Sequence, residues 1–214
     1  MHGIKVEGII LKRRNLGEAD RILTVFTLQK GKISVLAKGV RRITSRRAGN
    51  IELLNRVLLF LYQAKSFLIL TEAQSLQTFQ KIKEDLILST YAYHIIELID
   101  KLTAENQDNR ILYKHLVEVL ERLEQRPRQI LIRAFEAKIL SNLGFMGFGR
   151  EIREIGGIRE LLKKLEGFSW DEIEKMRISQ KQALELERVL RYHVERVIEG
   201  SLKSRQFLKE IKHG

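Results

Sequence analysis

The hydrophobic pattern of this chain changes its period near residue 75, and this change limits the folds that are open to it. Before that point, apolar residues come in short, partly alternating runs separated by glycines, which is typical of strands joined by tight turns. Beyond it, they recur at spacings of three and four residues, which is typical of amphipathic helices. The pattern therefore predicts an α+β, multi-domain protein, with strands in residues 1–79 and helices in residues 80–214.

The first part contains five apolar runs of strand length. They are residues 3–13, 20–29, 32–39, 55–63 and 66–73. Five strands with short turns would leave exposed edges in a flat open sheet, so we expect a small closed barrel.

The second part contains six segments with helical spacing. They are residues 87–102, 112–123, 127–143, 157–167, 169–176 and 179–200. The apolar stripe of residues 87–102 is wide, so we expect a central helix there. Pro127 is predicted in a first turn, Gly144 and Gly200 as helix ends, and Ser169 with Glu172 as a capping box.

Positive charge is concentrated in the first part. The chain has a net charge of +12, and residues 1–79 hold 14 Lys and Arg against 5 Asp and Glu. Residues 21–51 contain eight cations and no acid, and five of these cations lie in "AKGVRRITSRRAGN", residues 37–50. This asymmetry predicts a polyanion partner. A solvated loop that is basic by chance is the alternative, and a membrane surface is disfavoured because the stretch has no helical pattern.

We expect the phosphate contacts to come from the loop after the third strand and from its neighbours. The candidates are Lys12, Arg13, Arg14, Lys30, Lys32, Lys38, Arg41, Arg42, Arg46 and Arg47. A barrel with a basic groove is a common platform for single strands. Stacking surfaces for bases could come from Phe26, Phe60, Tyr62 and Phe67, although core packing is favoured for each of them.

Signs of enzyme chemistry are missing from the sequence. Five histidines are scattered along the chain, cysteine is absent, and no glycine-rich phosphate-binding motif is found. We therefore expect no metal, no cofactor and no enzymatic activity. The lack of cysteine favours the cytoplasm, no apolar run approaches the ~18 residues of a membrane span, and the first residues do not form a signal peptide pattern.

Two stretches resemble the RecO family of bacterial recombination mediators. They are residues 8–42, with "LKRRNLGEADR", "KGKIS" and "AKGVRR" followed by "SRR", and "RAFEAKILSNLGF" at residues 133–145. The resemblance implies an N-terminal OB-fold and a helical domain in a nucleoid-associated protein of DNA repair and recombination. It also implies binding to single- and double-stranded DNA, annealing of complementary strands, and cooperation with RecR in loading RecA onto DNA coated by single-strand binding protein.

The resemblance further implies that the helical domain grips the acidic tail of single-strand binding protein. Arg133 would clamp the terminal carboxylate of this tail, with Lys138 nearby, whereas a pairing of Arg133 with Glu136 or Glu118 is the alternative. Many relatives carry a four-cysteine zinc module after the second motif, but this chain has none, and we expect helices in its place around residues 147–157. An RNA-binding or ribosome-associated module is the rival function, and an enzyme with an accessory barrel is disfavoured.

Overall fold

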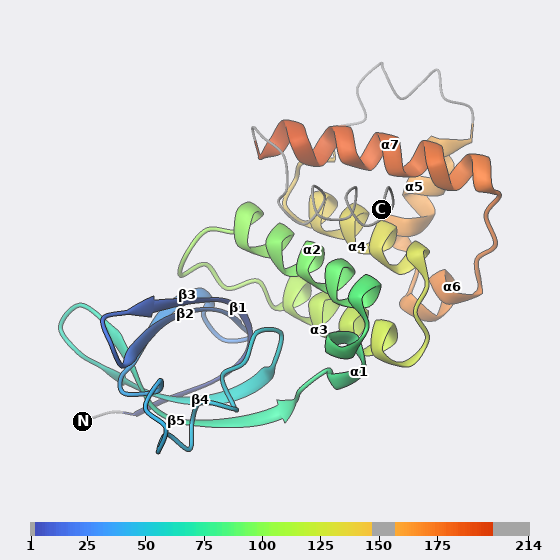
Figure 1. Cartoon of the computed structure of the whole chain (residues 1–214). Helices are drawn as coiled ribbons and strands as arrows, with labels where there is room; N and C mark the ends of the chain where they lie inside the picture. The colour runs from blue at the N-terminus through green and yellow to red at the C-terminus, as the bar shows by residue number, and fades with distance from the viewer. Residues whose placement is uncertain (1–2, 147–156, 199–214) are drawn as a thin grey trace. The chain divides into compact units, whose positions relative to one another are not determined.

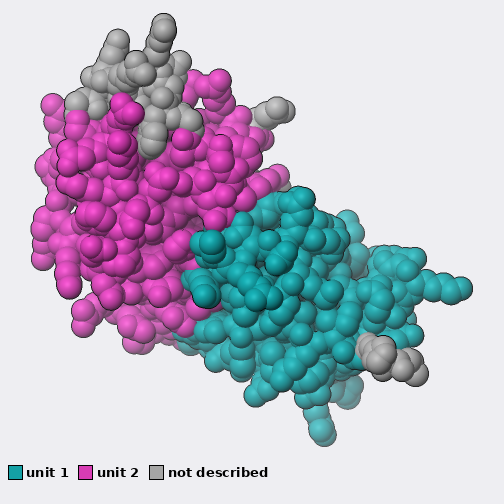
Figure 2. Space-filling view, turned by 180° about the vertical axis from the view of Figure 1, so that it is seen from behind, with its two compact units in different colours: residues 1–80, 103–114 teal, residues 81–102, 115–214 magenta. Residues whose placement is uncertain are grey.

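The computed structural model describes residues 3–146 and 157–198, which form five strands and seven helices. The chain divides into two compact units (Figure 2). One consists of residues 1–80 and 103–114, and the other of residues 81–102 and 115–214. Residues 103–114 thus belong to the strand-rich unit although the sequence assigned them to the helical part. The sequence predicted a boundary between two domains at residues 79 and 80. This domain boundary stays a prediction.

The strands close into a barrel, as the sequence predicted (Figure 1). They are β1 (Gly3–Leu16), β2 (Asp20–Thr27), β3 (Gly31–Ala37), β4 (Arg56–Gln63) and β5 (Leu68–Gln77). Their order around the barrel is β1-β2-β3-β5-β4, and β4 pairs again with β1. All pairs are antiparallel except β3 with β5. This is a five-stranded OB-fold barrel.

The first strand is long enough to serve two neighbours. Its first half pairs with β4 and its second half with β2, and the register shifts between Ile10 and Lys12. Such a bulge bends a strand and increases its twist, which barrel closure needs. The interior is filled by alternate residues of every strand, including Leu23, Val35 and Leu70. The residues between them therefore face outward.

Residues 103–114 pack on the outside of this barrel, within the same unit. The Phe26 and Tyr113 rings lie 6.2 Å apart, and the Tyr113 hydroxyl donates to Glu7 Oε1 at 3.0 Å. The amide nitrogen of Asn106 donates to the carbonyl oxygen of Lys32 at 2.8 Å. This segment therefore contacts the outer face of β2 and β3 near the turn that joins them.

The helical unit is built around one buried helix. The helices within the described residues are α1 (Gln80–Glu84), α2 (Leu86–Leu102), α3 (Arg110–Gln125), α4 (Gln129–Asn142), α5 (Ile158–Gly167), α6 (Trp170–Lys175) and α7 (Gln180–Val197). Almost every residue of α4 from Ile130 to Leu140 is buried, and α4 packs against α2, α5, α6 and α7. The expectation of a central helix over 87–102 was wrong, because α2 packs mainly against α4, whereas α4 also packs against α5, α6 and α7.

The predicted helix ends are partly confirmed. Gly144 adopts a φ of 77° after α4, and the amide of Phe145 donates to the carbonyl oxygen of Leu140, which forms a Schellman motif. Ser169 and Glu172 form the predicted capping box. Pro127 lies before the helix rather than in its first turn, because Arg128 is the N-cap. Gly200 and the segment 147–156, where helices were expected to replace the zinc module, lie outside the described residues.

The helices that the structure describes include none with the length and apolar character needed to span a membrane.

Candidate nucleic-acid interface

The basic loop, residues 38–47, follows β3 and consists of turns without helix. Its first residues are held against the turn between β1 and β2. The Gly39 amide donates to Asp20 Oδ1 at 2.7 Å, the Arg41 amide donates to the carbonyl of Ala19 at 2.9 Å, and Arg41 Nη1 donates to the carbonyl of Gly17 at 2.9 Å. These bonds fix the loop relative to two strands of the barrel.

Arg47 closes the loop at its other end. Its Nη2 donates to the carbonyl of Lys38 at 2.8 Å, and its Nη1 donates to the carbonyl of Leu70 at 2.9 Å. Further along, the buried Asn55 side chain donates to the carbonyl of Asn50, whose own side chain donates to the carbonyl of Ala73. Hydrogen bonds from side chains to the backbone of β5 therefore hold this segment in place, instead of the backbone pairing of a sheet.

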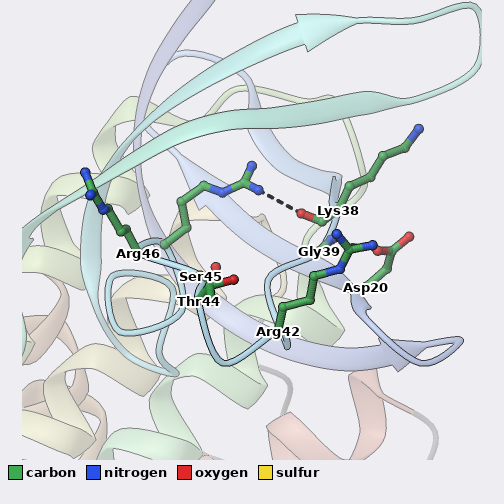
Figure 3. Close-up of a pocket in the computed structure, with 8 residues that line it drawn as sticks. Asp20, Lys38, Gly39, Arg42, Thr44, Ser45 and Arg46 are labelled. Atoms are coloured by element: carbon green, nitrogen blue, oxygen red, sulfur yellow. Dashed lines mark hydrogen bonds between the residues drawn. The ribbon is translucent and has the colours of Figure 1, made fainter.

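Between these anchors lies an open hollow of about 500 Å³ (Figure 3). It is lined by Asp20, Lys38, Gly39, Arg42, Thr44, Ser45, Arg46 and Arg47. The lining holds four cations and one carboxylate, and that carboxylate already accepts from the Gly39 amide. In the figure, Thr44 and Ser45 lie between Arg42 and Arg46. Such a surface can bind phosphate groups, because a guanidinium group forms bidentate hydrogen bonds with phosphate oxygens.

The structure gathers only part of the ten predicted phosphate contacts. Lys38, Arg42, Arg46 and Arg47 line the hollow, while Arg41 lies exposed in the same loop. On the adjacent β1, Lys12 and Arg14 are exposed, and Arg13 forms an ion pair with Glu52.

Two of the ten lie elsewhere. Lys30 and Lys32 are at the opposite end of β2 and β3, about 20 Å along the strands from Lys38. Lys32 is only 8% exposed. DNA binding by each of the ten residues stays a prediction.

The aromatic candidates have different surroundings. Phe26 is fully buried, which confirms the preference for core packing there. Phe60 is half-buried, with Lys5 Nζ 5.5 Å from its ring centre. Tyr62 and Phe67 flank the β4–β5 turn and are 36% and 62% exposed. Core packing therefore does not account for Phe67.

The helical unit gives Arg133 partners of its own. Its Nη1 lies 2.6 Å from Oε2 of the fully buried Glu136, and its Nη2 lies 3.6 Å from Glu187 Oε2. His94 Nε2 contacts the other oxygen of Glu136 at 2.6 Å. Burial lowers the pKa of Arg133, but these two glutamates more than offset this and raise the pKa above its usual value. Only 16% of the Arg133 side chain is exposed, and the pairing with Glu136 that the sequence offered as the alternative is present.

Lys138 is also engaged within the helical unit. Its ammonium donates to the carbonyls of Glu166 and Phe168 at 2.9 and 2.7 Å, at the end of α5, and lies 5.7 Å from the ring centre of Trp170. Burial lowers its pKa, and Glu166 and Glu172 offset this only in part. A tail that binds at Arg133 and Lys138 would have to share these contacts, and such binding stays a prediction.

Sequence reasoning missed the part that three further residues play at the hollow. Asp20, Thr44 and Ser45 line the hollow, and Asp20 anchors the loop through a contact 19 residues along the chain. A local sequence pattern cannot reveal a contact between residues that lie so far apart in the chain. Within residues 3–146 and 157–198, no three His, Cys, Asp or Glu side chains come close enough to share a metal ion.

Comparison with known proteins gives the same family over both units. The model of the recombination protein O N-terminal region matches residues 1–79, and that of its C-terminal region matches residues 83–146. Together they cover more than half of the chain.

Curated relatives extend this match. The DNA repair protein RecO of Symbiobacterium thermophilum is 29% identical over 97% of this chain and 97% of its own length. The DNA repair protein RecO of Acetivibrio thermocellus is 36% identical over 68% of this chain and 59% of its own length. The DNA repair protein RecO of Listeria monocytogenes is 31% identical over 65% of this chain and 55% of its own length. With an OB-fold barrel, a helical unit and both family regions in the expected order, this chain belongs to the RecO family.

Proposed function

We propose that this protein acts in DNA repair and recombination by binding DNA and annealing complementary single strands, without enzymatic chemistry. The observation that carries the proposal is the hollow on the barrel, where Lys38, Arg42, Arg46 and Arg47 surround an open space. Complementary strands repel each other through their phosphates. A surface that neutralises phosphates releases counterions and lets two strands approach, while base pairing supplies the specificity.

The same proposal includes partner proteins. With RecR, the protein would help load RecA onto DNA coated by single-strand binding protein, in association with the nucleoid. The helical unit would hold the acidic tail of that binding protein, and a carboxylate of the tail would share the Arg133 guanidinium with Glu136 and Glu187. These steps are supported by family membership.

The test is annealing of complementary DNA strands coated with single-strand binding protein. Wild-type protein should speed annealing, and the variant with Lys38→Ala, Arg42→Ala and Arg46→Ala should lose most of this effect. A matched control removes three exposed cations from the helical unit, with Lys101→Ala, Lys163→Ala and Lys181→Ala. Both variants have the same net charge, so a specific role of the loop predicts that only the first is impaired.

An RNA arm separates the proposal from its rival. Complementary RNA strands are offered to the same proteins under the same conditions. If wild-type protein does not speed DNA annealing, or speeds only the annealing of RNA, the proposed function is overturned. Equal losses in the two variants would instead refute the specific role of the basic loop.

A further inference from the structure

The strand register places an apolar row on the outside of the barrel. Directly paired positions run from strand to strand in the order Arg14, Ile22, Leu36, Ile69 and Tyr62. We call the last four residues of this row the apolar rung. It crosses β2, β3, β5 and β4, and Arg14 on β1 continues it with a positive charge.

The alternation of each strand shows that these side chains face outward. Leu23, Val35 and Leu70 are members of the barrel core, and each is the immediate neighbour of one rung residue. Side chains of successive residues point to opposite faces, so Ile22, Leu36 and Ile69 point away from that core. All three are half-buried rather than buried, and Tyr62 is 36% exposed.

The apolar rung lies beside the basic loop. Lys38 follows Leu36 by two residues, directly after the end of β3, and begins the basic loop. Arg47 binds the carbonyl of Leu70, the residue after Ile69. The other end of this face, near Phe26 and Lys32, is contacted by residues 103–114. Apolar side chains and phosphate-binding cations thus occupy adjoining parts of one surface.

We propose that the apolar rung packs against unpaired bases of single-stranded DNA while the basic loop holds the phosphates of the same strand. This inference rests on the proposed DNA binding and assigns a base subsite to it. Four strands about 4.8 Å apart give a row about 14 Å long, which is long enough to contact several unstacked bases of one strand. Every base has an apolar face, so the contact needs no sequence preference.

The subsite distinguishes substrate from product. In a duplex the base faces are stacked inside the helix, and the surface offered to a protein is phosphate and groove edge. Bases that pair must therefore leave the apolar rung, whereas the basic loop can hold either form of DNA. The rung thereby favours unpaired strands and weakens the hold on the annealed product, which lets the protein release it.

The first test substitutes the centre of the rung. In the variant, Leu36→Thr and Ile69→Thr place threonine, which has a high strand propensity, at both positions and remove apolar surface. The matched control has Leu58→Thr and Leu76→Thr, which lie on β4 and β5 outside the rung and outside the barrel core. Affinity for single-stranded and duplex DNA is measured over a range of salt concentrations for both proteins.

We expect the rung variant to bind single strands about tenfold more weakly or worse. Its duplex affinity and its salt slope should stay as in the wild type, because no phosphate contact is removed. The control should match the wild type throughout. Unchanged single-strand affinity in the rung variant would overturn the base subsite, and so would equal losses on single strands and duplex.

A second test does not depend on any variant folding. Wild-type protein is offered an oligonucleotide with four consecutive abasic sites and the same sequence with all its bases. The abasic strand should bind about tenfold more weakly with the same salt slope. Equal binding of both would refute the base subsite while leaving DNA binding intact. Failure of the wild-type protein to bind any DNA would instead refute the proposed function itself.

Discussion

The guanidinium of Arg47 donates to the carbonyl of Lys38 at 2.8 Å and so joins the two ends of the basic loop. A second bond, to the carbonyl of Leu70, attaches the same side chain to β5. Arg47 therefore shapes the hollow, while Arg42 and Arg46, which are exposed, line it. Cations with these two roles should respond differently to substitution.

Replacing Arg42 and Arg46 by alanine should weaken DNA binding and flatten its dependence on salt. Each phosphate contact contributes about −0.7 to the log–log slope on single strands, so the slope magnitude should fall by up to about 1.4. Fluorescence anisotropy of a labelled oligonucleotide at several salt concentrations measures this. A slope equal to that of the wild type, with the fold intact, would show that the loop is only a solvated surface.

Replacing Arg47 by alanine should loosen the loop itself. Without the two bonds to Lys38 and Leu70, the peptide bonds after Arg42 and Arg46 should become better substrates for trypsin, because cleavage follows local opening. Time courses of limited proteolysis, with the fragments identified by mass, measure the change. In the Arg41→Ala control, only the bond from Nη1 to Gly17 is lost, and cleavage should rise less.

Gly31→Ala should destabilise the barrel unit far more than Gly17→Ala. Both glycines have a positive φ, 63° and 55°, which costs an alanine about 1–2 kcal/mol. At Gly31 a Cβ would also lie 1.8 Å from the carbonyl oxygen of Gln107, whereas at Gly17 nothing lies within 4 Å. Overpacking adds about 1–3 kcal/mol. Urea unfolding measures the free energy of unfolding of both variants. Equal losses of stability would show that residues 103–114 move away from the added Cβ at little cost.

Local signals explain why much of the fold could be predicted. The strand runs are short and separated by turns, and Gly144 and Ser169 act on bonds within three to five residues of themselves. Predictions that depend on contacts between distant segments were weaker. The packing of residues 103–114 on the barrel depends on Tyr113 meeting Phe26 and Glu7, and the burial of α4 depends on four other helices. Neither leaves a periodic pattern.

The candidate site shows the same division. The cluster of Lys38, Arg42 and Arg46 follows from their closeness in sequence, so the stretch predicted it. Lys30 and Lys32 belong to the same acid-free stretch, but strand β3 carries the chain from one end of the barrel to the other and separates them from the loop. The apolar rung combines residues from four strands, and only the register brings them together.

The stability of the helical unit should fall as the pH drops from about 6.5 towards 4. Burial, helped by the charge of Lys138, lowers the pKa of His115 from 6.5 to about 4. Between these values the unfolded chain binds a proton that the folded chain does not, so acid favours unfolding. Above pH 6.5 this contribution is complete. The loss should be about 1–2 kcal/mol, after allowance for screening at this half-buried site.

Chemical unfolding at several pH values, followed by the fluorescence of the single Trp170, measures this dependence. The indole nitrogen of Trp170 donates to His115 Nδ1 at 3.2 Å. A His115→Gln variant keeps an acceptor for that bond but does not titrate, so its unfolding energy should depend less on pH over the same range. An identical pH dependence in both proteins would assign the effect to other groups.

Arg133→Ala should destabilise the helical unit by about 3–5 kcal/mol. The change removes the guanidinium next to the fully buried Glu136 and leaves that carboxylate with a missing partner, which is the costly case for buried ion pairs. Glu187→Gln should change stability by less than about 1 kcal/mol, because its carboxylate is 39% exposed and lies 3.6 Å from Arg133. Thermal and urea unfolding of both variants compare the two partners.

The predicted binding of an acidic tail at Arg133 can be tested without breaking the buried pair. Glu187 competes for the Nη2 side of this guanidinium, so Glu187→Gln should tighten the binding of a labelled tail peptide. A surface ion pair of about 0.2–1 kcal/mol corresponds to an increase of up to about fivefold. Glu185→Gln, on the same helix, makes the same change in net charge and should have a smaller effect. If both variants bind the peptide as the wild type does, Arg133 does not hold the tail, and its role is to neutralise Glu136 inside the helical unit.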